Sequence, residues 1–227
     1  MSSVDLTVVA DAEEAARLVA ERLAEQARVG GGIVLTGGST PRHAYELAAR
    51  LEPDWSRAEL WWGDERCVPP DDESSNYGMA KRALLDRLER EPAAVHRMHG
   101  ELGRDAGAEE YEREVAGVGV FDLVLLGLGP DGHIASLFPG SPTLDVTDRN
   151  AIGSEAGHEP FVDRISLTLP RLCATRELLF LVAGEDKADA VARAFAGEPS
   201  QETPGSLARA TGGTTRAVLD RAAASKL

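Results

Sequence analysis

The sequence predicts an α/β fold with a mostly parallel sheet flanked by helices. Short apolar segments with β-branched residues alternate along the chain with segments whose apolar residues recur at helical spacing. Several of the short segments pass into turns that contain glycine, so the loops at the carboxyl ends of the strands are expected to carry the functional side chains. The 227 residues can form a sizeable core, and we expect a single domain over residues 1–227.

The first strand is expected over residues 4–9, which have sufficient β-branched character. Asp11 with Glu14 resembles a capping box that has aspartate in place of serine or threonine, and it predicts the start of a helix. Small and branched apolar residues then recur at helical spacing as far as Ala27, with arginine and glutamate on the other face. The glycines at 30–32 are expected to end this helix.

A second buried strand, residues 33–35, precedes a polar turn and another helix that extends to Arg50. Thr40 is expected to cap this helix and Pro41 to take its first position. Backbone N–H groups, two hydroxyls and the positive end of the helix dipole would meet in the turn, which favours an anion. An ordinary strand-to-helix turn is the alternative, and a Walker A loop is excluded because no Gly-Lys-Ser/Thr follows. The turn consists of Gly37, Gly38, Ser39 and Thr40.

A third strand, residues 60–62, ends in the charged segment 64–66 (Asp-Glu-Arg). Two indoles directly before these charges indicate a partly buried place, where charges are paired or used, and a solvated loop is the alternative. An amphipathic helix is expected from Asn76 to Leu88.

His96 and His99 have a spacing found in metal sites, but no further ligands follow nearby. We therefore expect surface or strand-end histidines rather than a metal site. The next helix is expected over residues 109–115, and it leads to the central strand.

The segment 121–140 is the most informative part of the chain. Its apolar run 123–126 predicts a buried strand of a parallel sheet, followed by a turn with three glycines. Asp131 and His133 lie in this turn, at the strand's carboxyl end, where open α/β sheets bind their ligands. The turn also matches Gly-x-Gly-x-x-Gly. Prolines and a glycine at 139–142 interrupt the long helix that a dinucleotide site requires, so we do not expect NAD.

The C-terminal third begins with an irregular segment, 140–160, of the kind that forms a lid or a substrate wall. Lys187 is expected in the first turn of a later helix, where the dipole disfavours a cation unless an anionic ligand binds nearby; a solvent-facing lysine is the alternative. The remaining expected elements are strands at 164–170 and 178–182, a helix from 187 to 196, a loop at 199–205 and a terminal short strand or helix.

The composition limits the classes of function. A net charge of −14 makes nucleic acid and anionic membranes poor partners, so an anionic metabolite would need a local cationic pocket. Two distant cysteines argue against a disulfide framework and favour a reducing compartment. We see no signal peptide and no run near the ~18 apolar residues of a membrane span, so we expect a cytoplasmic protein. The final Ser225-Lys226-Leu227 matches a peroxisomal address, and we interpret it as a chance tripeptide.

Several segments, in order along nearly the whole chain, resemble the motifs of the 6-phosphogluconolactonases, relatives of the glucosamine-6-phosphate deaminases and isomerases. They are Thr36-Gly-Gly-Ser-Thr-Pro41, Gly63-Asp-Glu-Arg66 with Val68-Pro69, Ser75-Asn76, Gly127-Leu-Gly-Pro-Asp131-Gly-His133 through Pro139, Arg164-Ile-Ser-Leu-Thr and Gly184-Glu-Asp-Lys187. The resemblance implies a Rossmann-like α/β fold. The deaminases carry a glutamate soon after the histidine, whereas residues 135–139 contain no acid, which favours lactone hydrolysis. The last strand, near 215–218, lacks the aromatic residue that the family leads us to expect.

The resemblance implies hydrolysis of 6-phospho-D-glucono-1,5-lactone to 6-phosphogluconate, in the oxidative branch of the pentose phosphate pathway. His133 would be the general base that activates water. Asp131 would orient the imidazole or support its charged form, and Arg66 would stabilise the oxyanion or hold substrate oxygens. The residues that would bind the substrate and its phosphate are Gly37, Gly38, Ser39, Thr40, Asp64, Arg164 and Lys187.

No cofactor and no metal are expected, and the protein would be a monomer or a weak homo-oligomer. A glucosamine-6-phosphate deaminase or isomerase is the alternative enzyme, and a sugar-phosphate-binding module without turnover is the alternative class. Which of Asp64, Glu65 and Arg66 faces the substrate stays open at this point.

Overall fold

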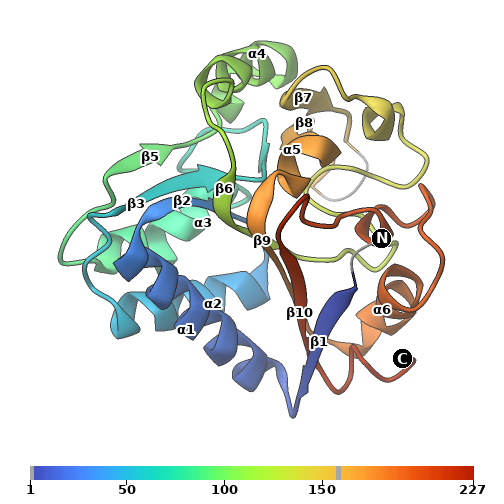
Figure 1. The fold of residues 1–227 in the computed structure, drawn as a ribbon. Coiled ribbons are helices and arrows are strands. Elements are labelled where there is room, and N and C mark those ends of the chain that lie inside the picture. Colours follow the sequence, from blue (N-terminus) through green and yellow to red (C-terminus); the bar gives the residue numbers. More distant parts are fainter. Residues whose placement is uncertain (1–2, 157–159) are drawn as a thin grey trace.

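The computed structural model describes residues 3–156 and 160–227 and contains a seven-stranded sheet (Figure 1). Its strands are β1 (Val4–Val9), β2 (Gly31–Leu35), β3 (Ala58–Trp62), β5 (Ala94–His96), β6 (Phe121–Leu126), β9 (Thr175–Val182) and β10 (Thr214–Asp220). The strand order is β1-β10-β9-β6-β2-β3-β5, and all neighbouring strands run parallel. The carboxyl ends of these strands therefore meet at one edge of the sheet.

The helices that connect the strands cover both sides of the sheet. They are α1 (Ala12–Val29), α2 (Ser39–Leu51), α3 (Asn76–Ala83), α4 (Arg104–Val115), α5 (Leu169–Cys173) and α6 (Ala188–Phe195). In Figure 1, α1 and α2 lie together on one side of the sheet, and α4 and α5 lie on the other. The predicted α/β class, with a mostly parallel, Rossmann-like sheet flanked by helices, is confirmed.

The central strands are apolar along most of their length because helices cover both faces of the sheet. The side chains of 33–35 in β2 and of 123–126 in β6 are fully buried. The capping box predicted for α1 also forms, since the Glu14 N–H donates to Asp11 Oδ1 at 2.9 Å. None of the described helices is both long and apolar enough to cross a membrane.

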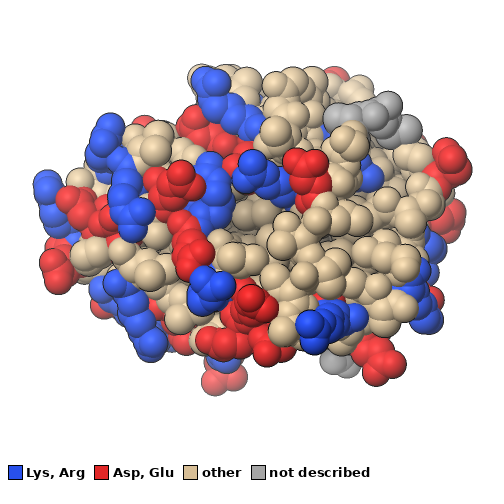
Figure 2. Space-filling view, turned by 60° about the horizontal axis from the view of Figure 1, so that its bottom comes forward, with Lys and Arg blue, Asp and Glu red and all other residues tan. Residues whose placement is uncertain are grey.

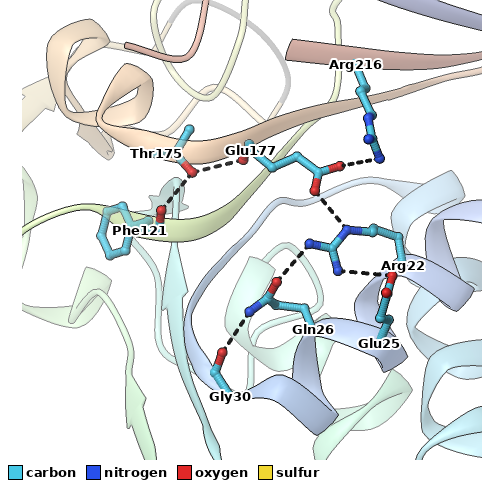
Figure 3. A network of polar contacts seen from close by, with 8 residues as sticks. All are labelled: Arg22, Glu25, Gln26, Gly30, Phe121, Thr175, Glu177 and Arg216. Carbon is cyan, nitrogen blue, oxygen red and sulfur yellow. Dashed lines mark hydrogen bonds and ion pairs between the residues drawn. The ribbon is translucent and has the colours of Figure 1, made fainter. Parts of the chain in front are cut away.

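A polar network joins α1 to the amino-terminal ends of β9 and β10 (Figure 3). Glu177 is 7% exposed, and its carboxylate accepts hydrogen bonds from Arg22 Nε at 2.8 Å and from Arg216 Nη1 at 3.4 Å. Arg22 also donates to the carboxamide of Gln26, which in turn donates to the Gly30 carbonyl at the end of α1. The network pairs a buried carboxylate and stabilises the end of the sheet opposite to the strand carboxyl ends.

A second, smaller sheet was not expected from the sequence. It is antiparallel, and its strands are β4 (Asp64–Arg66), β8 (Arg164–Leu167) and β7 (Ala151–Ser154), with β8 in the centre. The segment predicted as an irregular loop, 140–160, thus contains a strand, and residues 157–159 of it lie outside the described part. The strand predicted over 164–170 ends at Leu167 because α5 begins at Leu169. Of these strands only β8 was predicted; β4 and β7 are too short to leave a periodic pattern in the sequence.

Several element boundaries differ from the predictions. Gly38, with φ 112°, precedes α2 and replaces Thr40 as the N-cap, since this conformation favours glycine. The helix predicted from 76 to 88 ends at Ala83, and Leu84 leaves helical geometry to reach the core. The helix predicted over 109–115 begins earlier, at Arg104. Lys187 ends a short 3₁₀ turn directly before α6 rather than lying within that helix's first turn.

Candidate active site

A cavity of about 250 Å³ opens at the carboxyl ends of β2, β6 and β9. The small antiparallel sheet closes one side of it through β4 and β8. The predicted site residues that line the cavity are Gly37, Gly38, Ser39, Asp64, Arg66, His133, Arg164 and Lys187. Asp131 and Thr40, also predicted, are not part of the lining. Thr36, Asn76, Leu128 and Ala135 line the cavity as well and were not predicted as site residues.

The turn between β2 and α2 presents the amino end of a 13-residue helix to the cavity. Tyr45, fully buried on α2, holds the start of this turn: its hydroxyl accepts from the Thr36 N–H at 2.9 Å and donates to the Thr36 carbonyl at 2.7 Å. Burial raises the pKa of the Tyr45 hydroxyl, so that it remains a neutral donor. The turn at Gly37 to Ser39 therefore offers an anion the positive end of a helix in a fixed place.

Arg66 enters the cavity from β4 and is held by two acceptors. Its Nη1 donates to the Ser74 carbonyl at 2.6 Å and to Asn76 Oδ1 at 2.8 Å. Ser74 lies in the segment that leads into α3, and Asn76 is the first residue of this helix. The orientation of this guanidinium thus depends on residues that follow it by several positions in the sequence.

Glu65 is not part of the cavity lining, whereas Asp64 and Arg66, its neighbours in β4, are. Its carboxylate is 2% exposed and accepts from the N–H groups of Arg66, Asn76 and Tyr77 at 2.7 to 2.8 Å, and from the Ser75 hydroxyl at 3.0 Å. Burial raises the pKa of Glu65, and these hydrogen bonds oppose the rise. Glu65 therefore caps α3, while its neighbours on both sides line the cavity.

His133 and Asp131 form a pair in the turn after β6. The imidazole Nδ1 lies 2.6 Å from Asp131 Oδ1, and the same oxygen accepts from the His133 N–H at 3.1 Å. The backbone of the turn is closed by a bond from the Gly129 N–H to the His133 carbonyl at 2.9 Å. A Cβ on Gly129 would lie 2.1 Å from His133 Nδ1 and 2.7 Å from Asp131 Oδ1. Glycine is therefore required here because the pair packs directly against the backbone.

The chain after His133 makes a tight turn over 134–137 that also borders the cavity. Ala135 has φ 46°, which is uncommon for a residue with a side chain. The fully buried Ser136 holds the turn, because its hydroxyl donates to Asp64 Oδ2 at 2.7 Å and its carbonyl accepts from the Ser154 hydroxyl at 2.8 Å. The position of this turn is thus tied to both β4 and β7.

Arg164 and Lys187 add positive charge to the cavity from two other elements. Arg164, on β8, is only 4% exposed, and burial together with the neighbouring Arg66 lowers the pKa of its guanidinium. Lys187 follows the turn at Gly184, whose N–H donates to the buried carboxylate of Asp220 at 3.1 Å. Two guanidiniums close to one another favour a bound anion, since an anion would offset their repulsion.

Figure 2 shows how charged side chains are distributed on one face of the molecule. On the described part of the face in Figure 2, blue basic groups lie among red acidic ones, and a broad area is uncharged.

The histidines that raised the question of a metal site lie apart from the cavity lining. His96 stacks on Trp61 with ring centroids 3.7 Å apart, and its Nδ1 lies 3.3 Å from Glu114 Oε1. Nδ1 of His99 lies 3.2 Å from Glu101 Oε1. Within residues 3–156 and 160–227, no group of three histidine, cysteine, aspartate or glutamate side chains is arranged to hold a metal ion.

Comparison with known proteins identifies close relatives of the chain. The family model described as glucosamine-6-phosphate isomerases/6-phosphogluconolactonase matches residues 7–217. The 6-phosphogluconolactonase of Streptomyces coelicolor is 43% identical over 235 residues, covering 94% of this chain and 88% of that protein. The 6-phosphogluconolactonase of Mycobacterium tuberculosis is 40% identical over 211 residues, covering 86% and 84%.

Solved structures resemble the fold over its full length. The 6-phosphogluconolactonase from Trypanosoma brucei superposes with a TM-score of 0.88 at 26% identity, and the match covers 100% of both chains. A monomeric glucosamine-6-phosphate deaminase superposes with a TM-score of 0.85 at 21% identity, covering 99% of this chain and 100% of that one. This second likeness concerns the fold alone.

Proposed function

Because the chain belongs to the glucosamine-6-phosphate isomerase/6-phosphogluconolactonase family, we propose that it hydrolyses 6-phospho-D-glucono-1,5-lactone to 6-phosphogluconate. One observation carries the proposal. The Asp131-bound imidazole of His133 lines the same cavity as two guanidiniums, an ammonium and the amino end of α2. A base for water and a cationic place for a distant phosphate are thus available to one small molecule.

His133 acts as the general base. With the Nδ1 proton directed to Asp131, the lone pair of the imidazole is on Nε2, and this nitrogen takes a proton from water as the water oxygen attacks the lactone carbonyl carbon. The carbonyl π electrons move to the carbonyl oxygen, and Arg66 stabilises the resulting oxyanion. A lactone is an activated ester, so no covalent nucleophile is needed.

The tetrahedral intermediate then collapses. The carbonyl re-forms, the bond between the carbonyl carbon and the ring oxygen breaks, and His133 returns its proton to the ring oxygen. The new carboxylic acid ionises, so each turnover yields 6-phosphogluconate and one proton.

The phosphoryl group is bound by Lys187, Arg164 and the turn at Gly37, Gly38 and Ser39. Asp64 lines the substrate cavity, although both of its carboxylate oxygens already accept hydrogen bonds from Asn76 and Ser136. Its contribution to substrate binding is therefore largely indirect.

The proposal is tested with freshly prepared 6-phospho-D-glucono-1,5-lactone and a pH indicator that records proton release. We expect hydrolysis well above the spontaneous rate, undiminished by a chelator. The same preparation is assayed for ammonia release from glucosamine 6-phosphate, which a deaminase would produce. Residues 135–139 contain no carboxylate, so we expect none. Tight binding of 6-phosphogluconate without hydrolysis of the lactone would instead favour a binding module.

A further inference from the structure

The carboxamide of Asn76 lies between Arg66 and Asp64, the cationic and the acidic side chain that β4 presents to the cavity. Asn76 is the first residue of α3 and is 2% exposed. Its Oδ1 accepts from Arg66 Nη1 at 2.8 Å, and its Nδ2 donates to the Asp64 carbonyl at 2.9 Å and to Asp64 Oδ1 at 3.2 Å. Acceptor and donor are thus both committed, which leaves the carboxamide one orientation.

The neighbouring Gly37 leaves room for this carboxamide. A Cβ on Gly37 would lie 2.1 Å from Asn76 Oδ1, so any side chain there would displace the oxygen that holds Arg66. Gly37 has no left-handed backbone angle that would require glycine by itself. The close approach of Asn76 is therefore the physical reason for glycine at this position.

The same network extends to the turn that carries His133. Asp64 Oδ1 accepts from Asn76, and Asp64 Oδ2 accepts from the Ser136 hydroxyl at 2.7 Å, three residues after His133. A continuous buried chain of hydrogen bonds thus runs from Arg66 through Asn76 and Asp64 to the 134–137 turn. It relates the position of the oxyanion-stabilising group to that of the base.

We propose that Asn76 is a positioning residue that holds Arg66 at the lactone carbonyl; this inference rests on the proposed function. With Nη1 held by Asn76 and Ser74, the guanidinium that lines the cavity is fixed in one orientation. A group that meets charge developing in the transition state must be placed in advance, and a displacement near 1 Å can cost on the order of 10²-fold in rate.

The competing explanation is that Asn76 only stabilises α3. Truncation of the Asn76 side chain leaves two hydrogen bonds at the start of α3 in place. The Asn76 N–H donates to Glu65 Oε1, and the Gly78 N–H donates to Ser75 Oγ. Truncation thus separates the two explanations, since the start of α3 keeps these hydrogen bonds while Arg66 loses one of its two acceptors.

The test is a double-mutant cycle with Asn76→Ala, Arg66→Ala and the combination, each assayed for kcat and KM on the lactone. We expect Asn76→Ala to lower kcat on the order of 10²-fold with a much smaller change in KM. In the Arg66→Ala background the same truncation should change kcat by less than about twofold, which is within the error of such a comparison. The effect of Asn76→Ala would then depend on Arg66. Gly37→Ala should likewise lower kcat. The double variant with Asn76→Ala should have a kcat only slightly below that of Asn76→Ala alone.

Three outcomes would overturn the inference. An unchanged kcat in Asn76→Ala means that Arg66 needs no support, and an equal loss with and without Arg66 means that Asn76 acts on the substrate itself. A loss that follows only the fraction of folded protein, measured by thermal unfolding, means a purely structural role.

Asn150→Ala is the matched control. The Asn150 carboxamide donates to Glu112 Oε1 at 2.9 Å, and neither residue lines the cavity, so the kcat of this variant should equal that of the wild type. If the wild type itself does not hydrolyse the lactone, the proposed function fails rather than this inference.

Discussion

The imidazole Nδ1 of His133 lies 2.6 Å from Oδ1 of Asp131, and the two side chains belong to one glycine-rich turn. The separation of two residues lets the same carboxylate oxygen also accept the His133 backbone N–H at 3.1 Å. Asp131 therefore positions both the ring and the backbone that carries it. Both members of the pair belong to a single turn of the chain.

Removal of the imidazole tests its role as the base. His133→Ala should lower kcat by about 10²–10⁴-fold, the usual contribution of a general base, with the fold unchanged. Steady-state kinetics on the lactone and circular dichroism measure the two effects. His43→Ala is the control, since His43 lies on the exposed side of α2 next to Glu13. An undiminished rate in His133→Ala would remove this residue from the mechanism.

A methyl group at position 129 tests the geometry of the pair rather than its chemistry. Gly129→Ala places a Cβ within 2.1 Å of His133 Nδ1, so the ring or the turn must move. Since small displacements of catalytic groups are costly, we expect kcat to fall by about 10-fold or more, while the melting temperature falls only slightly. Gly117→Ala has open space around its Cβ and should match the wild type in rate. Wild-type kinetics in Gly129→Ala would contradict the packing described for the turn.

The ammonium at position 187 is expected to bind the phosphate in both ground and transition states. Lys187→Ala should therefore raise KM by about 10-fold or more and change kcat much less, because uniform binding affects mainly KM. The control Lys81→Ala removes an exposed lysine whose partner is Asp86. A loss confined to kcat, with KM unaltered, would argue that Lys187 acts in the chemical step and not on the phosphate.

The network of Glu177 is expected to affect stability and not activity. Glu177→Ala leaves Arg22 without its carboxylate partner, and hydrogen bonds to charged groups contribute about 1.5–3 kcal/mol each, so the free energy of unfolding should fall by that order. Urea denaturation measures it. Glu25→Ala, whose side chain is 67% exposed, should change it by less than about 0.5 kcal/mol. The kcat of folded Glu177→Ala should equal that of the wild type, because Glu177 lies at the other end of β9 from the cavity.

The pair of Arg97 and Glu101 predicts a dependence of stability on pH. Hydrogen bonding from Arg97 lowers the pKa of Glu101 from 4.5 to about 2. A carboxyl whose pKa is lower in the folded state than in the unfolded state stabilises the protein at pH values above its unfolded-state pKa. This contribution is lost as the pH falls toward the folded-state pKa. The difference in unfolding free energy between wild type and Glu101→Gln should thus shrink between about pH 4.5 and pH 2.

Urea titrations at several pH values measure this difference. In an Arg97→Ala background, Glu101→Gln should show little dependence on pH, since the partner that lowers the pKa is gone. A difference that stays constant down to pH 2 would show that the pair contributes nothing to stability.

Several elements could be predicted because their signals are local. The apolar runs of β2 and β6 reflect burial on both faces of the sheet, and the pair of Asp11 and Glu14 caps α1 within one helical turn. Asp131 and His133 could be singled out for the same reason, since a single glycine-rich turn contains both of them. Parallel pairing then brings the turns after β2, β6 and β9 to one edge, so the location of the cavity also follows.

Other features depend on pairing between distant segments. β4 is a strand only because β8 pairs with it, and three charged residues leave no strand pattern of their own. Glu65 was indistinguishable from its neighbours until α3 supplied the N–H groups that its carboxylate caps. Asn76 was noticed as part of a motif, yet its contact with Arg66 requires the close approach permitted by Gly37.

The sequence by itself determined the layered architecture, the edge of the sheet that carries the cavity, and the acid–imidazole pair, because each follows from periodicity or from neighbours a few residues apart. Only the tertiary structure decided which charges of the 64–66 segment face the cavity and what holds Arg66 in place. These depend on hydrogen bonds between segments separated by ten to more than seventy residues, as between Arg66 and Asn76 or Asp64 and Ser136, and a backbone must fold before such partners meet.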